Sequence, residues 1–391
     1  MSACPSTYLD HGATTPLRSE VAQAMSEARS EPLGNPTGSH RPAQRARRLL
    51  EESRDEVASH LGRDPGEIIF TSGGTESANL AVFGTLGAPL WSGRPHSVLS
   101  SAVEHPAVRE SCRAAATPGD AVTWREVPVV ASGVVDLAAV AAAVDDTTAL
   151  VAVMLANNET GVVQPLDAVV EAVRARSDNA RIFTDAVQAA AFMDLAACTS
   201  GADLVALSAH KVGGPVGIGV LAVRPPTAIV PYQYGGGQER ERRSGTQNVV
   251  GAVGLATALR LAAGERRDTV RLAGARRDRL AAGLVGSVAG AHRTTPPGVA
   301  TLPGHLHLCF EGIEREELLL ALSERGICAS GGSSCASGAL EPSYVLAAMG
   351  VPDELARGAI RFTLGPDTSD ADVDRALAIV PGVIASLRHE P

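Results

Sequence analysis

The stretch that decides the fold is Leu204-Val205-Ala206-Leu207-Ser208-Ala209-His210-Lys211-Val212-Gly213-Gly214. A short apolar run ends here directly in a polar, glycine-containing turn. In α/β proteins, ligands bind outside the carboxyl ends of the strands. A lysine at such a strand end is a candidate Schiff-base nucleophile. Most lysines, however, are solvated surface residues, so this segment alone leaves both interpretations open.

The same alternation of short apolar runs and longer helical patterns extends outward from this stretch. Strands are predicted at Glu67–Phe70, His96–Ser101, Ala149–Leu155, Arg181–Thr184, Asp203–Leu207 and Gly217–Val223. Helices are predicted at Arg41–Leu61, from Thr75, from Pro106 and at Leu166–Ala175. Such alternation predicts an α/β fold with a mostly parallel sheet.

The pattern changes from about Gly251. A long helical stretch reaches Leu284, and a strand at His305–Phe310 and a helix at Arg315–Arg325 follow it. This change predicts a second, smaller α+β domain.

Composition excludes several protein classes. The chain has 391 residues, a net charge of −9 and six cysteines. An acidic balance argues against a dedicated nucleic-acid binder. The cysteines are too sparse for a disulfide scaffold and form no C-x-x-C pair, so a metal site is not expected. No basic leader or membrane-length apolar run is present, which predicts a cytoplasmic protein with reduced thiols.

Polar motifs follow the other predicted strands. Asp185 ends one strand, and a carboxylate there is costly unless it meets a cation, such as a protonated pyridine nitrogen, or caps a helix. The turn Thr71-Ser72-Gly73-Gly74-Thr75 opens a helix whose free N–H groups suit a phosphate. Glu104-His105-Pro106 and Asn157-Asn158-Glu159 close two further strands. The segment Gly214–Gly219 is not a dinucleotide loop, because a strand follows it where a helix is required.

Cys335 lies in the Gly/Ser-rich segment Ser330–Gly338. These surroundings are typical of an exposed, movable thiol that can act as a nucleophile. The remaining cysteines are predicted to be ordinary structural residues: Cys4, Cys112, Cys198, Cys309 and Cys328.

Taken together, these segments resemble the cysteine desulfurases, a group of class-V aminotransferases that use pyridoxal 5'-phosphate. The shared motifs run almost from end to end: Tyr8–Pro16, Gly34–Pro36, Thr71–Asn79, Glu104–Val108, Asn157–Gly161, Asp185–Gln188, Ser208–Lys211, Arg243–Thr246, Ser330–Tyr344 and Arg361–Gly365. The Ser-Ser-Cys segment followed by Leu-Glu-Pro-Ser is similar to the NifS/IscS-like group, whose cysteine lies on a long mobile loop. The short Arg-x-Gly-His-His-Cys segment of the other group is absent.

The resemblance implies the type I fold of pyridoxal-phosphate-dependent transferases, also called the aspartate aminotransferase fold. It implies a large cofactor-binding domain at residues 17–256. Residues 1–16 and 257–391 would form the small domain that carries the cysteine loop. It also implies a homodimer and a sulfur-acceptor protein as partners, with no membrane and no direct nucleic-acid binding.

The resemblance further assigns roles to site residues. Lys211 would hold the cofactor aldehyde, Asp185 would keep the pyridine nitrogen protonated, and His105 would stack on the ring. The cofactor would also be bound by Gly74, Thr75, Asn158, Gln188, Ser208, His210 and, from the partner subunit, Thr246. Arg361, Asn158 and Asn35 would bind the substrate. Cys335 would take the sulfur of L-cysteine as a persulfide, leaving L-alanine.

Several alternatives stay open at this stage. The nearest is a selenocysteine lyase or another class-V enzyme, although an aminotransferase has no need of the Cys335 thiol. A non-catalytic scaffold would be expected to have lost Lys211, Asp185 or Cys335, yet all three are present. Acceptors of the persulfide in iron–sulfur cluster assembly, tRNA thiolation, DNA phosphorothioation and thio-cofactor synthesis are all compatible with the sequence.

Overall fold

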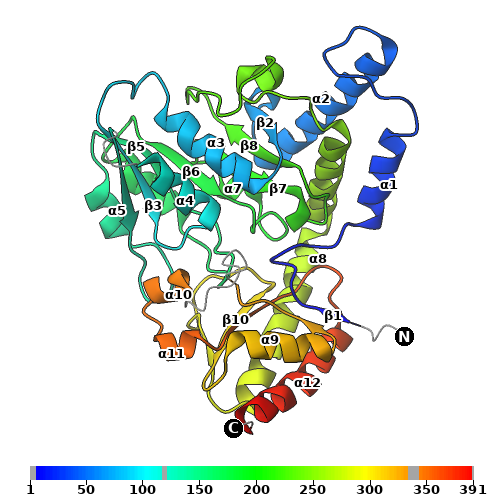
Figure 1. Cartoon of the computed structure of the whole chain (residues 1–391), viewed down its shortest axis with the longest axis vertical. Helices are drawn as coiled ribbons and strands as arrows, with labels where there is room; N and C mark the ends of the chain where they lie inside the picture. Colours follow the sequence, from blue (N-terminus) through cyan, green and yellow to red (C-terminus); the bar gives the residue numbers. More distant parts are fainter. Residues whose placement is uncertain (1–5, 117–120, 333–342, 390–391) are drawn as a thin grey trace.

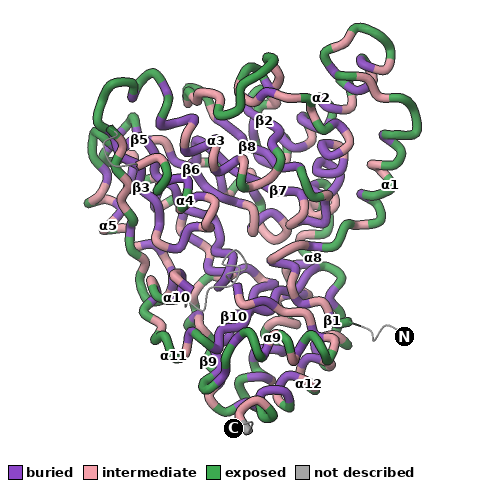
Figure 2. Tube along the Cα trace, viewed as in Figure 1, coloured by how far each residue is buried: buried purple, intermediate pink, exposed green. Residues whose placement is uncertain are grey.

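A computed structural model describes residues 6–116, 121–332 and 343–389. Its elements form two parts, seen one above the other in Figure 1. A seven-stranded sheet occupies the upper part, and a three-stranded sheet lies in the lower part. Buried residues concentrate along the strands of both sheets, as Figure 2 shows, so each part has its own apolar core.

The large sheet has the strand order β2-β8-β7-β6-β5-β3-β4. Its strands are β2 (Ile68–Thr71), β3 (His96–Ser101), β4 (Val122–Val127), β5 (Thr148–Ala152), β6 (Arg181–Asp185), β7 (Leu204–Ser208) and β8 (Gly219–Val223). All neighbouring pairs are parallel except those of β8, which runs antiparallel to β2 and β7. The predicted mostly parallel sheet is therefore confirmed.

Helices cover the large sheet. They are α1 (Ser19–Ala28), α2 (Arg41–Leu61), α3 (Gly74–Leu86), α4 (Pro106–Ala115), α5 (Leu137–Ala143), α6 (Leu166–Arg174) and α7 (Leu195–Cys198). Successive strand residues belong to different apolar clusters: Val205 and Leu207 pack on one face, Leu204 and Ala206 on the other. Because both faces of these strands are buried, their sequences are continuous apolar runs and do not alternate between apolar and polar residues.

The lower part combines the two ends of the described chain. Its antiparallel sheet has the order β12-β10-β9, formed by β9 (Ala291–Arg293), β10 (His305–Phe310) and β12 (Ala359–Thr363). A small parallel pair joins β1 (Thr7–Tyr8) to β11 (Ile327–Cys328). The helices are α9 (Arg315–Glu324), α10 (Tyr344–Ala348), α11 (Asp353–Ala356) and α12 (Asp370–His389). This arrangement matches the predicted smaller α+β unit.

The long helix α8 (Val249–Ser287) links the two parts. Residues near its start, such as Leu255, pack in the core of the large sheet, whereas Leu280 packs in the lower core. The domain boundary predicted between residues 256 and 257 falls inside this helix and stays a prediction. Within the described ranges, no helix combines the length and the apolar character needed to span a membrane.

Candidate active site

A cavity of about 470 Å³ lies where the carboxyl ends of the central strands face the lower part. This volume falls in the usual range of small-molecule sites, roughly 300–1,000 Å³. Most residues predicted from the sequence line it: Gly74, Thr75, His105, Asn158, Asp185, Gln188, Ser208, His210, Lys211 and Arg361. The fold thus gathers the strand-end motifs around one space, as expected of an α/β sheet.

Lys211 follows β7 on the short 3-10 helix Ala209–Lys211. Its Nζ donates hydrogen bonds to the carbonyl oxygens of Gly12, at 2.6 Å, and Ala13, at 2.9 Å. The hydroxyl of Thr15 donates to the Lys211 carbonyl at 3.1 Å. The N-terminal segment therefore holds both the amine and the backbone of this lysine at the cavity wall.

Asp185 is the last residue of β6 and is buried. Its Oδ1 accepts a hydrogen bond from the Val187 N–H at 2.9 Å and so caps a turn. The predicted helix-capping role is wrong, because the next helix, α7, is capped by Asp194. Burial raises the pKa of this carboxyl to about 6, although the positive charge of Lys211 opposes the shift. A cation bound in the cavity would stabilise the ionised form of Asp185.

His105 caps the N-terminus of α4, where its Nδ1 accepts from the Ala107 N–H at 3.1 Å. Because Nδ1 is an acceptor, the proton of the neutral ring is assigned to Nε2. Burial, together with the charge of Lys211, lowers the pKa of His105 to about 4, so the ring is neutral near pH 7.

Glu104, next to His105, is fully enclosed. It accepts from the Ser101 hydroxyl at 2.6 Å and from the Met154 N–H at 2.7 Å. Burial raises the pKa of Glu104 to about 8. These bonds tie the end of β3 to the chain that follows β5, which sets the position of His105 at the cavity.

The turn between β2 and α3 brings a helix N-terminus to the cavity. No side chain caps this end of the 13-residue helix α3, so its first N–H groups stay available. Gly74 and Thr75 line the cavity together with Ser208. A Cβ atom at Gly219 would lie 2.6 Å from the Cα of Gly73, so only glycine lets β8 approach the turn this closely. Such a site suits a phosphate.

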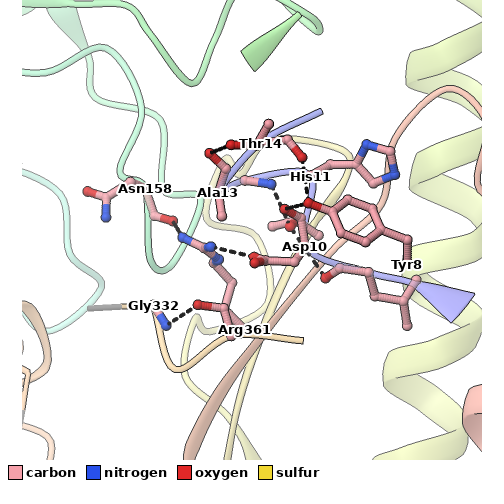
Figure 3. Close-up of polar contacts among 12 residues, drawn as sticks. Tyr8, Asp10, His11, Ala13, Thr14, Asn158, Gly332 and Arg361 are labelled. Atoms are coloured by element: carbon pink, nitrogen blue, oxygen red, sulfur yellow. Dashed lines mark hydrogen bonds and ion pairs between the residues drawn. The ribbon is translucent and has the colours of Figure 1, made fainter. Parts of the chain in front are cut away.

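The other side of the cavity carries hydrogen-bonding side chains. The Oδ1 atom of Asn158 is buried and has no hydrogen-bond partner in the structure. Gln188 donates through Nε2 to the Gly12 carbonyl at 2.9 Å, and the Nδ1 atom of His210 lies 3.1 Å from the Thr14 hydroxyl. Arg361, on β12, is held by the Asn158 carbonyl and the Asp10 carboxylate (Figure 3). An orphaned buried acceptor such as Asn158 Oδ1 calls for a ligand donor.

Two of the predicted residues that the structure describes do not line the cavity of this chain. Asn35 is exposed, and its Oδ1 accepts from the backbone N–H and the hydroxyl of Thr37. Thr246 is exposed as well, and it was predicted to act in a partner's site. Cys335 lies outside the described residues. Of the other cysteines, Cys112 and Cys309 are buried, as expected for structural residues.

The sequence did not single out several residues at this site. Glu159 and Tyr344 line the cavity, and Asp10 pairs with Arg361. Asp10 and Tyr344 belong to shared motifs, and Glu159 follows a polar strand end. The shared motifs and the polar strand end identify these segments. They do not indicate which side chains of each segment point toward the cavity.

Comparison with known proteins identifies the family. The class-V aminotransferase family matches residues 7–376. The chain is 39% identical over 382 residues to the cysteine desulfurase IscS of Methanosarcina thermophila, an alignment covering 98% of this chain and 93% of that protein. Among solved structures it is similar to a NifS-like protein, with a TM-score of 0.90, 34% identity and coverage of 97% of this chain and 100% of the other.

A second similar structure is described as SspA in complex with cysteine. Its TM-score is 0.79 at 29% identity, and the alignment covers 93% of this chain and 100% of the other. All these matches span nearly the whole chain, and the family match over residues 7–376 includes every strand-end motif around the cavity. The chain belongs to the class-V aminotransferase family, as a cysteine desulfurase of its NifS/IscS-like group.

Proposed function

We propose that this chain removes sulfur from L-cysteine with pyridoxal 5'-phosphate, releases L-alanine and keeps the sulfur as a persulfide on Cys335. The observation that carries the proposal is the convergence of Lys211, Asp185, His105 and Arg361 on one cavity. Each supplies a different requirement: an amine, an anion, a neutral imidazole and a cation for a carboxylate.

The residues present fit the cofactor. The open N-terminus of α3 suits its phosphate, with Thr75, Ser208 and His210 nearby. The buried Asp185 suits a cationic ring nitrogen, and the orphaned Asn158 Oδ1 suits a polar group of the ligand. Lys211 is the residue that would hold the aldehyde. When bound, pyridoxal 5'-phosphate supplies an electron sink for negative charge that develops on the substrate carbons.

The protein side chains divide the proton and binding steps. Lys211 Nζ, as a free and neutral amine, would take a proton from the substrate Cα. His105 stays neutral and offers a proton at Nε2. Arg361 binds the substrate carboxylate, because a guanidinium matches the two carboxylate oxygens in geometry and charge.

Cys335 performs the sulfur step in this proposal. Its thiolate attacks the substrate sulfur, and an S–S bond forms as the C–S bond breaks. The electron pair of the broken bond stays with the substrate carbon, which is then protonated to give the methyl group of L-alanine. Gly332 and Ser343, the described residues on either side of the segment that carries Cys335, both line the cavity, which supports this role.

We further propose that the chain acts as a homodimer that passes the persulfide sulfur to an acceptor protein in the cytoplasm. Thr246 is exposed and does not line the cavity of its own chain, in line with a role in the partner's phosphate site. Tyr232 and Tyr234, in the same connection between β8 and α8, are 54% and 81% exposed. Exposed aromatic residues in the segment that also carries Thr246 are typical of a subunit interface.

Alanine and sulfide release from L-cysteine in the presence of a thiol reductant tests the proposal. Cys335→Ser is expected to bind the cofactor normally but to lose alanine formation by at least ~1,000-fold, as for removal of other nucleophiles. Cys328→Ser is the matched control and keeps its activity. Equal activity of Cys335→Ser and the wild type would show that Cys335 is not the nucleophile and would favour a lyase reaction.

A further inference from the structure

Arg361 is a deeply buried cation whose guanidinium is held from two sides. Only 2% of the residue is exposed. Nη1 donates to the Asn158 carbonyl at 2.8 Å, and Nη2 donates to Asp10 Oδ1 at 2.7 Å. Figure 3 shows these two oxygens on either side of the guanidinium, with Asp10 on the N-terminal segment. The two groups that hold Arg361 therefore come from chain segments outside its own strand.

The backbone fixes Asp10 beside Arg361. Thr363, two residues after Arg361 on β12, donates its N–H to the Leu9 carbonyl at 2.7 Å. The Gly12 N–H donates to the Thr363 hydroxyl at 2.7 Å. A Cβ atom at Gly12 would lie 3.2 Å from Cζ of Arg361, so the segment passes directly against the guanidinium. These contacts fix the position of Asp10 relative to β12. Its carboxylate is therefore held next to Arg361, unlike that of a mobile surface residue.

Charge balance gives Asp10 a specific task. A buried guanidinium is costly without a counter-charge, and its long side chain has much rotamer freedom to lose. Among the described residues, Asp10 is the carboxylate that forms an ion pair with Arg361. The buried Glu159 also interacts electrostatically with Arg361, but its carboxylate accepts from the Ser343 hydroxyl, and burial raises its pKa. The nearby His305 and His307 are buried and have pKa values near 3, so they remain neutral. The Asn158 carbonyl is neutral as well.

We propose that Asp10 is a positioning residue that orients Arg361 for the carboxylate of the amino-acid substrate. The proposal rests on the role proposed above for Arg361. Asp10 and the Asn158 carbonyl each accept a hydrogen bond from one terminal nitrogen of Arg361. The orientation of the guanidinium is therefore fixed before the substrate arrives. Its remaining N–H groups then bind the carboxylate without first losing rotamer freedom, which is the benefit of preorganisation.

The test compares two ligands of the cofactor-loaded protein that differ only in the carboxylate: L-alanine and ethylamine. Binding is followed in the absorption band of the cofactor. Asp10→Asn is expected to weaken L-alanine binding about 10- to 100-fold, the range of a lost charge-assisted hydrogen bond, and to leave ethylamine binding unchanged. The KM for L-cysteine rises by a similar factor, whereas kcat changes less.

Thr7→Val is the matched control. It removes another side-chain contact of the same segment, the hydrogen bond of Thr7 Oγ1 to Asp372 Oδ1 at 3.2 Å, without touching Arg361. It is expected to leave the affinities for both ligands unchanged. Melting temperatures of both variants separate a structural loss from a binding loss.

Three results would overturn the proposal: equal weakening of both ligands in Asp10→Asn, unchanged L-alanine affinity, or tighter L-alanine binding. The last would mean that Asp10 competes with the substrate carboxylate. The variant Arg361→Lys distinguishes a failure of the proposal for Asp10 from a failure of the proposed function. If Arg361→Lys keeps the preference for L-alanine over ethylamine, Arg361 is not the carboxylate receptor and Asp10 positions nothing. Cys335-dependent alanine formation would still stand in that case.

Discussion

Asp185 shows how one side chain controls the proposed chemistry. Its pKa is raised by burial, so the carboxylate lacks a full counter-charge in the protein alone. Asp185→Asn keeps the size and the hydrogen bond from Val187 but removes the anion. We expect alanine formation to fall by at least ~100-fold, the cost of removing one preorganised electrostatic group. Alanine release under saturating cofactor measures the effect.

Asp194→Asn is the matched control for that substitution. Asp194 caps α7 through its Oδ1, and asparagine caps a helix about as well as aspartate. This variant is expected to keep wild-type activity and stability. A similar loss of activity in both variants would mean that the effect at Asp185 is not electrostatic.

At the scale of elements, α8 joins the two cores, and two of its glycines, Gly264 and Gly286, have open space where a side chain would lie. Gly264 is exposed, and a Cβ atom built there meets no atom within 4 Å. Gly264→Ala is therefore expected to stabilise the protein by about 0.5–1 kcal/mol, because glycine is the poorer helix former. Urea denaturation at fixed cofactor concentration measures this change in the free energy of unfolding.

Gly254, on the same helix, gives the opposite expectation. A Cβ atom there would lie 2.9 Å from Met25 Sδ and 2.9 Å from Pro215 Cδ. Gly254→Ala should therefore destabilise the protein although it gains the same helix propensity. If both variants were stabilised alike, the close packing of α8 on the large part would be contradicted.

An element could be predicted well where its own residues mark its ends or form a continuous apolar run. The helix α2 has the predicted bounds, because Pro42 marks its first turn and Gly62 ends it with a left-handed backbone, at φ 61°. The strand β4 was not predicted. It lies at the sheet edge and is mostly half-exposed, so it lacks the continuous apolar run of β5 or β7.

For the whole molecule, buried histidines make stability depend on pH. Burial lowers the pKa values of His305 and His307 to about 3 from an ordinary 6.5. The unfolded chain therefore binds protons below pH 6.5 that the folded chain does not, and stability falls as the pH drops toward 4. His307→Asn should reduce this slope by roughly 1.4 kcal/mol per pH unit, measured by urea denaturation from pH 4 to 7.

Glu104 acts in the opposite direction. Burial raises its pKa from 4.5 to about 8, so the folded state keeps a proton that the unfolded state loses. The stabilising effect is complete below pH 4.5 and disappears as the pH rises through 8. Glu104→Gln should therefore remove a fall in stability between about pH 4.5 and 8, whereas His307→Asn removes a rise in stability between about pH 3 and 6.5. The same slope change in both variants would contradict these assignments.

The site itself was only partly predictable from the sequence. The strand-end motifs identified Lys211, Asp185 and His105, because a parallel sheet brings the carboxyl ends of its strands together. The pairing of Asp10 with Arg361 was not predicted, since no periodicity relates residues 351 positions apart. Contacts of that kind follow from the packing of the two parts and carry no local signature.

The N-terminal segment has a consequence for the way the protein is made. Asp10 leaves the ribosome roughly 20 to 70 seconds before Arg361, at a synthesis rate of about 5–20 residues per second. Until Ile327 and Cys328 have been made, β1 has neither β11 nor β12 beside it, although the strands of the large sheet are complete at Val223. A nascent chain interrupted after Val223 but before Ile327 thus carries Lys211 and Asp185 but lacks β11, the strand with which β1 pairs.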